Sequence, residues 1–273
     1  MNTNRILIIF SVLITFNACS NENEPGQEED LLVLEAYLYN GMPIENISLS
    51  KTISFTSADT IFPRISEAFI SICWNNQTYP LIPSEKEGFY HNPDTNLKII
   101  TGETYQIEAL YADKVLSAQT IVPQPSGELN LSTNTLYIDP NLTPREMMQN
   151  GIGTIEITWD NPSNDYFFLA IENLETNPET IDLGFDGGGK SFTFRSQPFN
   201  TEAFSARLFM AIKQYGTHRV RLFRVNQEYV DLYTNLEQDS RDLNEPLTNV
   251  ENGLGIFTAF GDYEEAFFEV YKQ

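Results

Sequence analysis

The stretch LLVLEAYLY, residues 31–39, places apolar side chains at every second position of an extended chain. The positions that share one face are Leu32, Leu34, Ala36 and Leu38. Successive side chains of a β-strand point to opposite faces, so this spacing predicts a strand with one face in a core. The Asn40-Gly41 pair that follows is typical of a turn. Short alternating runs separated by turn residues continue along the chain and decide its fold class.

Six further segments of the N-terminal part show the same pattern. They are residues 44–50, 68–74, 78–82, 88–91, 104–110 and 115–122. With the first stretch they make seven short strands, and none of them has helical periodicity. Such a series is typical of an immunoglobulin-like sandwich. The sequence therefore predicts an N-terminal immunoglobulin-like β-sandwich over residues 31–123.

The region after this sandwich has a different composition. Residues 123–127 read PQPSG, a segment rich in proline and glycine that indicates a domain boundary. Farther on, Thr143 and Glu146 have the spacing of a capping box, and a proline occupies the first helical position between them. We therefore expect a linker over residues 124–150 that contains one short helix.

The C-terminal part returns to alternating strands. A helix with one apolar stripe fits residues 227–239, and Asn226 is its expected cap. The strand, Trp159, Pro162 and the tyrosine-led strand that follows are similar to the opening of a fibronectin type III domain. The expected strands are residues 152–160, 166–172, 203–212, 218–225, 255–260 and 266–271. We expect a fibronectin-like β domain with one helix over residues 151–273, and hence a mainly all-β chain of two sandwich-like domains.

The N-terminus has the pattern of an export signal. Residues 6–16 form an apolar run of eleven that is too short to span a bilayer but has the length of a signal-peptide core. The sequence FNAC at residues 16–19 resembles a lipobox, in which the cysteine is diacylated and becomes the first mature residue. We therefore expect a lipoprotein signal peptide over residues 1–18 and a lipid on Cys19. An ordinary signal peptide with an incidental Cys19 is the alternative.

Residues 19–30 are polar and acidic and contain Pro25 and Gly26. Such a run buries too little apolar surface to offset the entropy of ordering it, so it is interpreted as a flexible tether. Acidic residues after a lipidated cysteine also resemble the signal that sends lipoproteins of some Gram-negative groups to the cell surface. A solvated spacer that carries no export signal explains the run equally well. The sequence therefore leaves open which leaflet of the outer membrane holds the protein.

Charge and cysteine content exclude several classes of partner. The chain has 38 acidic and 16 basic residues, for a net charge of -22. Nucleic acid and anionic bilayers should repel it, so contact with a membrane requires the lipid on Cys19. Cys73 is the one other cysteine, so no disulfide framework is expected. Cys73 lies in an apolar run and is interpreted as a small buried side chain.

The segment GFDGGGKS, residues 184–191, matches the phosphate-binding loop pattern G-x-x-x-x-G-K-[ST]. That loop works only between a buried strand and a helix, whose free N–H groups hold the phosphates. The preceding segment is polar and contains Pro178, and residues 191–195 alternate as a strand. The sequence therefore predicts a glycine-rich hairpin tip with no nucleotide.

Other catalytic and metal patterns are absent from the sequence. His91 and His218 are the two histidines, and we interpret them as solvated turn residues rather than zinc ligands. No G-x-S-x-G nucleophile elbow occurs, and the many carboxylates make any single pair uninformative. We expect a protein without enzymatic activity, metal or cofactor.

Aromatic residues make up 12% of the chain, and a stacking surface for a sugar or another ligand is one interpretation of them. Packing in the sandwich core and on strand faces uses the same residues and is the favoured interpretation. The candidate platform consists of Tyr37, Tyr39, Tyr79, Tyr90 and Tyr105.

Several motifs of the chain resemble one protein family over residues 30–262. They are LLVLEAYL, AFISICWNNQTYPL, GETYQIEA, ITWDNPSNDYFFLAI, VRLFRVNQEYVDLYTNL and the closing segment NVENGLGIF, residues 249–257. Together they resemble the Bacteroidetes lipoprotein family called domain of unknown function 4249. The closing segment is similar to that family's N-x-x-G-G-x-G-x-F pattern, with Asn252 in place of the first glycine. Asparagine tolerates positive φ better than most residues, so this departure is mild.

The resemblance implies an exported outer-membrane lipoprotein, often encoded beside a TonB-dependent transporter, with no established activity and no catalytic residues. Residues and resemblance together predict a lipid-anchored protein of the outer membrane or cell surface. We expect it to be a non-enzymatic accessory or ligand-capture module for such a transporter. A structural or adhesive surface protein that binds other proteins or matrix is the alternative.

Overall fold

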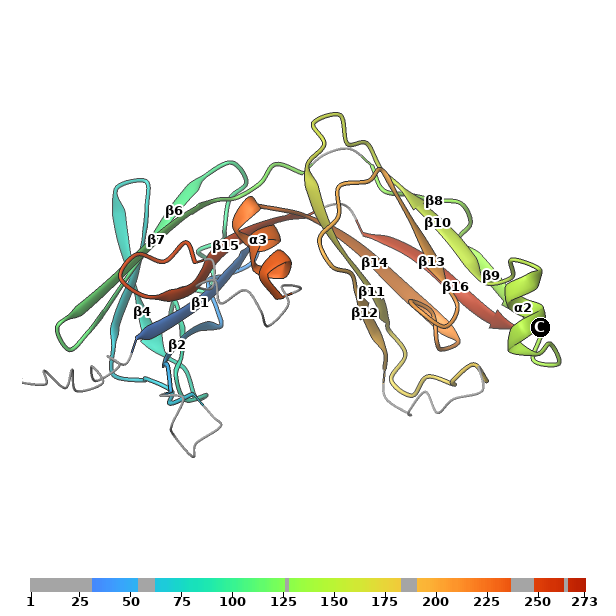
Figure 1. The fold of residues 1–273 in the computed structure, drawn as a ribbon, viewed down its shortest axis with the longest axis horizontal. Coiled ribbons are helices and arrows are strands. Elements are labelled where there is room, and N and C mark those ends of the chain that lie inside the picture. The colour runs from blue at the N-terminus through green and yellow to red at the C-terminus, as the bar shows by residue number, and fades with distance from the viewer. Residues whose placement is uncertain (1–30, 54–61, 126–127, 183–190, 237–247, 263–264) are drawn as a thin grey trace, which may run out of the picture.

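A computed structural model describes residues 31–53, 62–125, 128–182, 191–236, 248–262 and 265–273. These residues form two β-sandwich lobes that lie side by side (Figure 1). The predicted all-β class with two sandwich-like units is confirmed. Within the same ranges, no helix has the length and apolar character needed to cross a membrane.

The N-terminal lobe contains every strand that was predicted for it. Its strands are β1 (Leu32–Tyr39), β2 (Ile47–Lys51), β3 (Phe69–Trp74), β4 (Gln77–Pro83), β5 (Phe89–His91), β6 (Thr104–Tyr111) and β7 (Lys114–Ile121). One layer runs β1-β2-β5, and β4 passes from it into the second layer, β4-β3-β6-β7. The inner faces enclose one core that includes Leu34, Ile72 and Tyr105. The alternation works because each strand turns every second side chain into this core.

The C-terminal lobe is a second sandwich. Its elements are β8 (Asn130–Leu131), β9 (Thr135–Ile138), α2 (Pro144–Gln149), β10 (Thr154–Thr158), β11 (Tyr166–Asn173), β12 (Thr193–Arg195), β13 (Ala203–Arg207), β14 (Gly216–Val225), α3 (Gln227–Leu236), β15 (Leu254–Asp262) and β16 (Ala266–Lys272). The layer β12-β11-β14-β16-β9 packs on the layer β13-β10-β8. Between them lies a separate core that includes Ile157, Phe167 and Leu222.

Strand β15 belongs to both lobes, which differs from the predicted boundary. Residues 254–260 pair in parallel with β1, and residues 260–262 pair with β14. The predicted C-terminal domain, residues 151–273, therefore supplies a strand to the N-terminal sheet. Alternation along a strand indicates which face is buried but not which strand lies beside it.

The predicted linker, residues 124–150, also contributes to the fold. β9 pairs in parallel with β16 and places Leu136 and Ile138 in the C-terminal core. Helix α2 begins with the predicted capping box, because the Glu146 backbone N–H donates to Thr143 Oγ1 at 3.3 Å and the Thr143 backbone N–H donates to Glu146 Oε2 at 2.8 Å. The sequence indicated the helix, but the two-stranded parallel contact needed the folded chain.

Side chains from both lobes meet around α3 and close the junction. Asn226, the expected cap of α3, donates its amide to Thr120 Oγ1 at 3.0 Å and to the Ile121 carbonyl at 2.8 Å. Thr120 in turn donates to Glu228 Oε1 at 2.8 Å. Behind these bonds lies an inter-lobe aromatic cluster, which consists of Tyr37, Tyr39, Tyr166, Phe168, Phe223, Tyr229, Tyr233 and Phe260. These contacts hold the two lobes in one orientation.

The closing segment, residues 249–257, leads into β15 and includes its first residues. The Asn249 side chain donates to the Phe257 carbonyl at 2.7 Å and accepts from the Phe257 N–H at 2.9 Å, so it replaces a neighbouring strand. Asn252 has φ 58°, as its glycine-like position requires. Gly255 has φ +114°, and a Cβ there would lie 1.9 Å from the Leu34 carbonyl oxygen. The motif is therefore explained by structure without any ligand.

The Gly255→Ala variant should lose more than about 3 kcal/mol of the free energy of unfolding, because it combines a forbidden φ with a backbone clash at β1. Gly41→Ala is the matched control, since Gly41 has φ +73° but open space around a Cβ. That control should lose only about 1–2 kcal/mol. Urea unfolding measures both variants, and equal losses would show that the approach to Leu34 is unimportant.

Candidate functional site

The outer face of the layer β4-β3-β6-β7 points away from the core and carries its side chains in cross-strand rows. One polar row is Thr78, Cys73, Gln106 and Gln119. The next polar row is Pro80, Ser71, Glu108 and Ser117. The third row is apolar and consists of Phe69, Leu110 and Val115. We call this surface the outer face, and its polarity changes along the strands.

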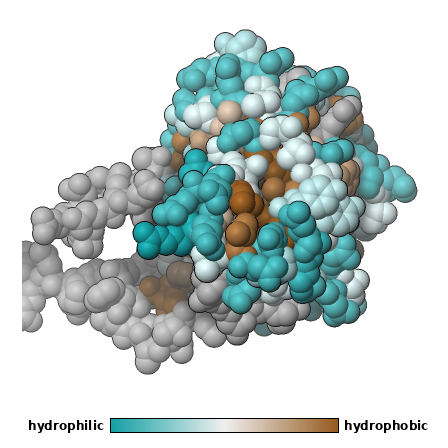
Figure 2. All heavy atoms as spheres, turned by 90° about the vertical axis from the view of Figure 1, so that its right-hand side faces the viewer, coloured by the Kyte–Doolittle hydropathy of each residue, from teal (hydrophilic) through white to brown (hydrophobic). Residues whose placement is uncertain are grey.

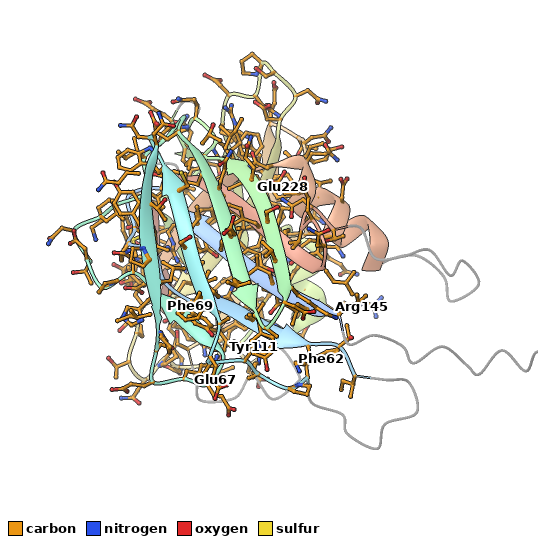
Figure 3. All side chains as sticks on the ribbon, turned by 90° about the vertical axis from the view of Figure 1, so that its left-hand side faces the viewer. Phe62, Glu67, Phe69, Tyr111, Arg145 and Glu228 are labelled. Atoms are coloured by element: carbon orange, nitrogen blue, oxygen red, sulfur yellow. The ribbon has the colours of Figure 1, made fainter. Side chains whose placement is uncertain are left out.

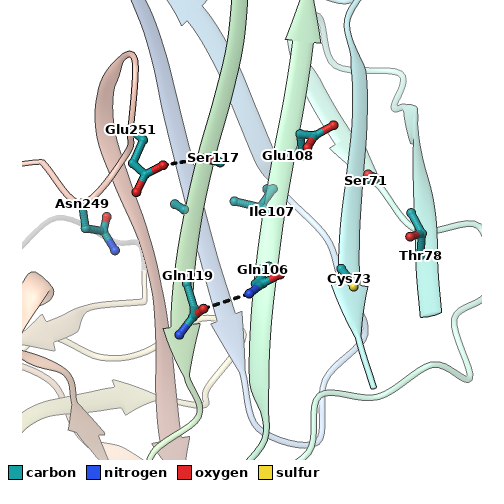
Figure 4. Close-up of a pocket in the computed structure, with 11 residues that line it drawn as sticks. Ser71, Cys73, Thr78, Gln106, Ile107, Glu108, Ser117, Gln119, Asn249 and Glu251 are labelled. Carbon is teal, nitrogen blue, oxygen red and sulfur yellow. Dashed lines mark hydrogen bonds between the residues drawn. The ribbon is translucent and has the colours of Figure 1, made fainter. Parts of the chain in front are cut away.

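The polar rows line a groove of about 560 Å³ (Figure 4). Gln106 Nε2 donates to Gln119 Oε1 at 2.9 Å. At the groove's edge, Ser117 Oγ donates to Glu251 Oε2 at 3.0 Å, which joins β7 to the segment before β15. Amide and hydroxyl groups of this kind can donate to and accept from a polar ligand. The groove therefore suits a hydrogen-bonding partner such as a sugar or an extended peptide.

The apolar row borders a second hollow, of about 520 Å³. Phe69 is 78% exposed although it lies within a paired strand. Its neighbours Ile82, Leu110 and Val115 are exposed to 43%, 38% and 42%. Scattered exposed apolar residues are ordinary, but a contiguous row across a sheet is typical of an interaction surface. The opposite end of the molecule, which the C-terminal lobe forms, is mainly hydrophilic around one central hydrophobic area (Figure 2).

The apolar row lies at the end of the sandwich where β1 begins. Figure 3 shows Phe62, Phe69 and Tyr111 at the same end of this lobe. Lys51 joins that end to the start of β1, because it pairs with Leu32 and its Nζ lies 5.1 Å from the centre of the Tyr111 ring. The chain that precedes residue 31 therefore joins the lobe beside the apolar row.

Cys73 lies on the outer face, which corrects the prediction that it is buried. It is partly exposed in a polar row, whereas its neighbour Ile72 is in the core. The segment FISICW has an apolar residue or cysteine at every position except Ser71, so its weak alternation did not reveal that Cys73 faces outward.

The five candidate tyrosines do not form one platform. Tyr90 is buried and donates to the Ile65 carbonyl at 2.9 Å, and Tyr105 is buried and accepts from the Ile100 N–H at 3.0 Å. Burial raises the pKa of both phenols, as expected for core residues. Tyr79 is partly exposed and stacks on Trp74, whose ring also stacks on the buried Tyr105.

The remaining two tyrosines lie at the junction of the lobes. Burial raises the pKa of Tyr37 to about 12, and its ring packs against Phe260. Tyr39 stacks on Phe260 with 4.8 Å between ring centres and stays 41% exposed. The structure therefore distributes the candidate platform over three places. Cys19, the tether and residues 184–190 of the glycine-rich segment lie outside the described residues.

His218 is buried on β14, which corrects the prediction of a solvated turn residue. Its ring lies parallel to Phe268, with 4.8 Å between centres. The Gly216 carbonyl can only accept, so Nδ1, at 2.9 Å from it, carries the proton of the neutral ring. Burial lowers the pKa of His218 to about 4, and the ring is neutral at neutral pH. His91 is partly exposed on β5.

The outer face was missed because its rows join residues that are far apart in the sequence. Phe69, Leu110 and Val115 each sit in an alternating segment at the position that faces out. An outward phenylalanine and an outward leucine were visible as departures from strict alternation. The pairing register that aligns these residues in one row was not visible in the sequence.

Comparisons with known proteins give one family and a set of solved structures. The family model described as "Domain of unknown function (DUF4249)" matches residues 20–266. No curated protein matches. Among solved structures, a two-domain fibronectin type III segment of chicken tenascin is 10% identical, covering 88% of this chain and 99% of its own, with TM-score 0.24. The CBD12 structure from CALX1.2 is also 10% identical, covering 89% and 99%, with TM-score 0.24.

The pKa of His218 predicts a pH-dependent stability. Its folded value, about 4, lies below the ordinary 6.5, so the unfolded chain binds the extra proton between these values. The contribution of His218 to the free energy of unfolding should be fully present above pH 6.5. At pH 5 the free energy of unfolding should be about 2 kcal/mol lower. Urea unfolding between pH 7 and 5 tests this. His218→Gln should flatten the slope and His91→Gln should keep it, and a slope that persists in His218→Gln would contradict the assignment.

Proposed function

The chain belongs to the domain of unknown function 4249 family, and on that premise we propose that it is a lipid-anchored outer-membrane lipoprotein with a non-enzymatic binding role. Diacylated Cys19 is the anchor, and the outer face of the N-terminal lobe is the binding surface. Its partner is a TonB-dependent uptake transporter, for which the protein is an accessory or ligand-capture module. The observation that carries the proposal is the exposed apolar row of Phe69, Leu110 and Val115.

The position of the row supports a partner within the same membrane. Twelve residues, 20–31, separate Cys19 from Leu32, so the anchor and the start of β1 are at most roughly 45 Å apart. The row lies at that end of the lobe, so the tether is short enough for the row to reach a partner in the same membrane. A net charge of -22 disfavours an anionic lipid surface as the occupant. An apolar rim of a membrane-embedded protein fits both constraints.

The polar groove supports the capture part of the proposal. It lies directly beside the apolar row on the same strands, so a docked partner would border it. Its amide and hydroxyl groups suit weak, exchangeable hydrogen bonds. A ligand held there could pass to a transporter without crossing solvent.

Replacing the apolar row should separate the protein from its partner. The full-length lipoprotein is purified from membranes in mild detergent, and the co-purifying β-barrel is identified by mass. Phe69→Ser with Leu110→Ser should reduce the recovered transporter at least about tenfold, because both side chains would be buried at the interface. Tyr137→Ser is the matched control, since Tyr137 is 60% exposed on the other lobe. Recovery of wild-type protein with no barrel would contradict the transporter role.

The anchor has an independent test. Cys19→Ala should release the protein from the membrane fraction or leave the signal peptide attached, because the acyl chains are its membrane contact. Cys73→Ala is the control and should stay in the membrane. Unchanged retention of Cys19→Ala would contradict the anchor. If matrix binding rather than transporter recovery depended on Phe69, the structural or adhesive alternative would take its place.

A further inference from the structure

The apolar row of the outer face has a carboxylate on each side. Glu67 precedes Phe69 by two residues on the chain that enters β3, and Glu108 precedes Leu110 by two residues on β6. Phe69 pairs with Leu110 and Ser71 pairs with Glu108, so the two strands run in opposite directions. Glu67 and Glu108 therefore flank the pair of Phe69 and Leu110 from opposite ends. Both acidic residues are exposed, and Figure 3 shows Glu67 and Phe69 at the same end of the lobe.

Both carboxylates line the hollow of about 520 Å³ beside the row. Its wall also includes Phe69, Ile82 and Leu110, and no lysine or arginine lines it. Among the described residues, no ion pair joins Glu67 or Glu108 to a basic side chain. The hollow thus combines an apolar wall with two negative charges that no lining residue compensates.

Basic side chains near this end of the lobe have other contacts. Arg64, three residues before Glu67, lies over the Phe89 ring, with its guanidinium carbon 5.2 Å from the ring centre. Lys51 lies over the Tyr111 ring in the same way, at 5.1 Å. Because both cations contact aromatic rings within the lobe, the carboxylates of the hollow are left to an outside partner.

The charge of the hollow limits what can occupy it. Residues 20–30, which join the lobe beside the row, contain five carboxylates and no basic residue, so repulsion disfavours them as the occupant. A second copy that docked through the same surface would bring its own Glu67 and Glu108 against these two residues. The complementary occupant is a segment of a different protein that is both basic and apolar.

We propose that the hollow holds an extended segment of the partner in which a basic, an apolar and a basic side chain occupy alternate positions. The identity of that partner as a transporter rests on the proposed function, and the inference adds the chemistry that the partner must present. Glu67 and Ser71, the residue beside Glu108, are four residues apart, which is about 13 Å in an extended chain. Three alternate side chains of an extended segment face one way and span the same distance. The apolar one then packs on Phe69 and Leu110, and the basic ones reach the two carboxylates.

A short peptide tests this chemistry directly. The probe is acetyl-Gly-Lys-Ser-Leu-Ser-Lys-Gly-amide, and its counterparts carry glutamate in place of both lysines or serine in place of the leucine. Binding of each dye-labelled peptide to the full-length protein in neutral detergent is measured by fluorescence anisotropy. The lysine peptide should bind, the glutamate peptide should not, and loss of the leucine should weaken binding. Raising NaCl from about 50 to about 500 mM should also weaken binding, because salt screens exposed charges.

Variants of the protein assign the contacts. Glu67→Gln with Glu108→Gln should weaken binding of the lysine peptide about tenfold, because each exposed ion pair contributes about threefold. Glu128→Gln with Glu202→Gln removes the same charge from exposed positions outside the outer face and should bind as the wild type does. Since Glu67 and Glu108 are exposed, their double variant should keep the wild-type thermal unfolding midpoint. Wild-type protein that binds the glutamate peptide equally well, or a double variant that binds the lysine peptide as the wild type does, would overturn the proposal.

Co-purification separates this inference from the proposed function. The Glu67→Gln, Glu108→Gln protein should recover the β-barrel at least about threefold less than the wild type. If it recovers as much, the chemistry of the segment is wrong and the transporter role stands. If the wild type recovers no barrel but binds the lysine peptide through Glu67 and Glu108, the transporter role is wrong and the chemistry stands. Sedimentation of the wild type as a dimer that Phe69→Ser dissociates would place a second copy in the hollow and overturn the proposal.

Discussion

The parallel pairing of β1 with β15 is the constraint on which the rest of the molecule depends. It joins residues 33–39 to residues 254–260, so the N-terminal sandwich is complete only when nearly the whole chain has been made. Two devices hold it: Asn249 occupies the backbone groups of Phe257, and Gly255 lets β15 approach the Leu34 carbonyl. The loop-closure entropy of so distant a contact is offset by burial of Phe257 and Ala259 in the N-terminal core.

The same strand makes the two lobes one unit. Because β15 ends against β14, the outer sides of β1 and β14 form a continuous surface, on which Tyr39, Phe260 and Phe223 meet. Helix α3 covers part of it, and Asn226 and Glu228 bind β7 beside it. Thr258 is fully buried in this region, and its hydroxyl has no hydrogen-bond partner in the described chain. A buried hydroxyl without a partner costs free energy. The aromatic packing around it fixes the orientation of the two lobes.

The outer face and the inter-lobe aromatic cluster differ in what creates them. The outer face is the solvent side of a single layer. Its polarity changes because outward positions change from amide and hydroxyl groups to Phe69, Leu110 and Val115. The inter-lobe aromatic cluster instead combines Phe223 of β14 and Phe260 of β15 with Tyr39 of β1. The first belongs to a single lobe, while the second requires both. Loss of the β1–β15 contact would therefore affect the second surface more than the first.

By itself, the sequence determined the strands other than β8 and β9, both helices, the capping box of Thr143 and Glu146 and the all-β class, because these depend on local periodicity and local hydrogen bonds. Tertiary structure decided that β15 crosses to β1, that β9 joins β16, and that Cys73 faces outward while His218 is buried. It also divided the five tyrosines between the N-terminal core, a stack on Trp74 and the junction. Pairing partner and register depend on contacts between distant segments, and alternation within one segment carries no information about them.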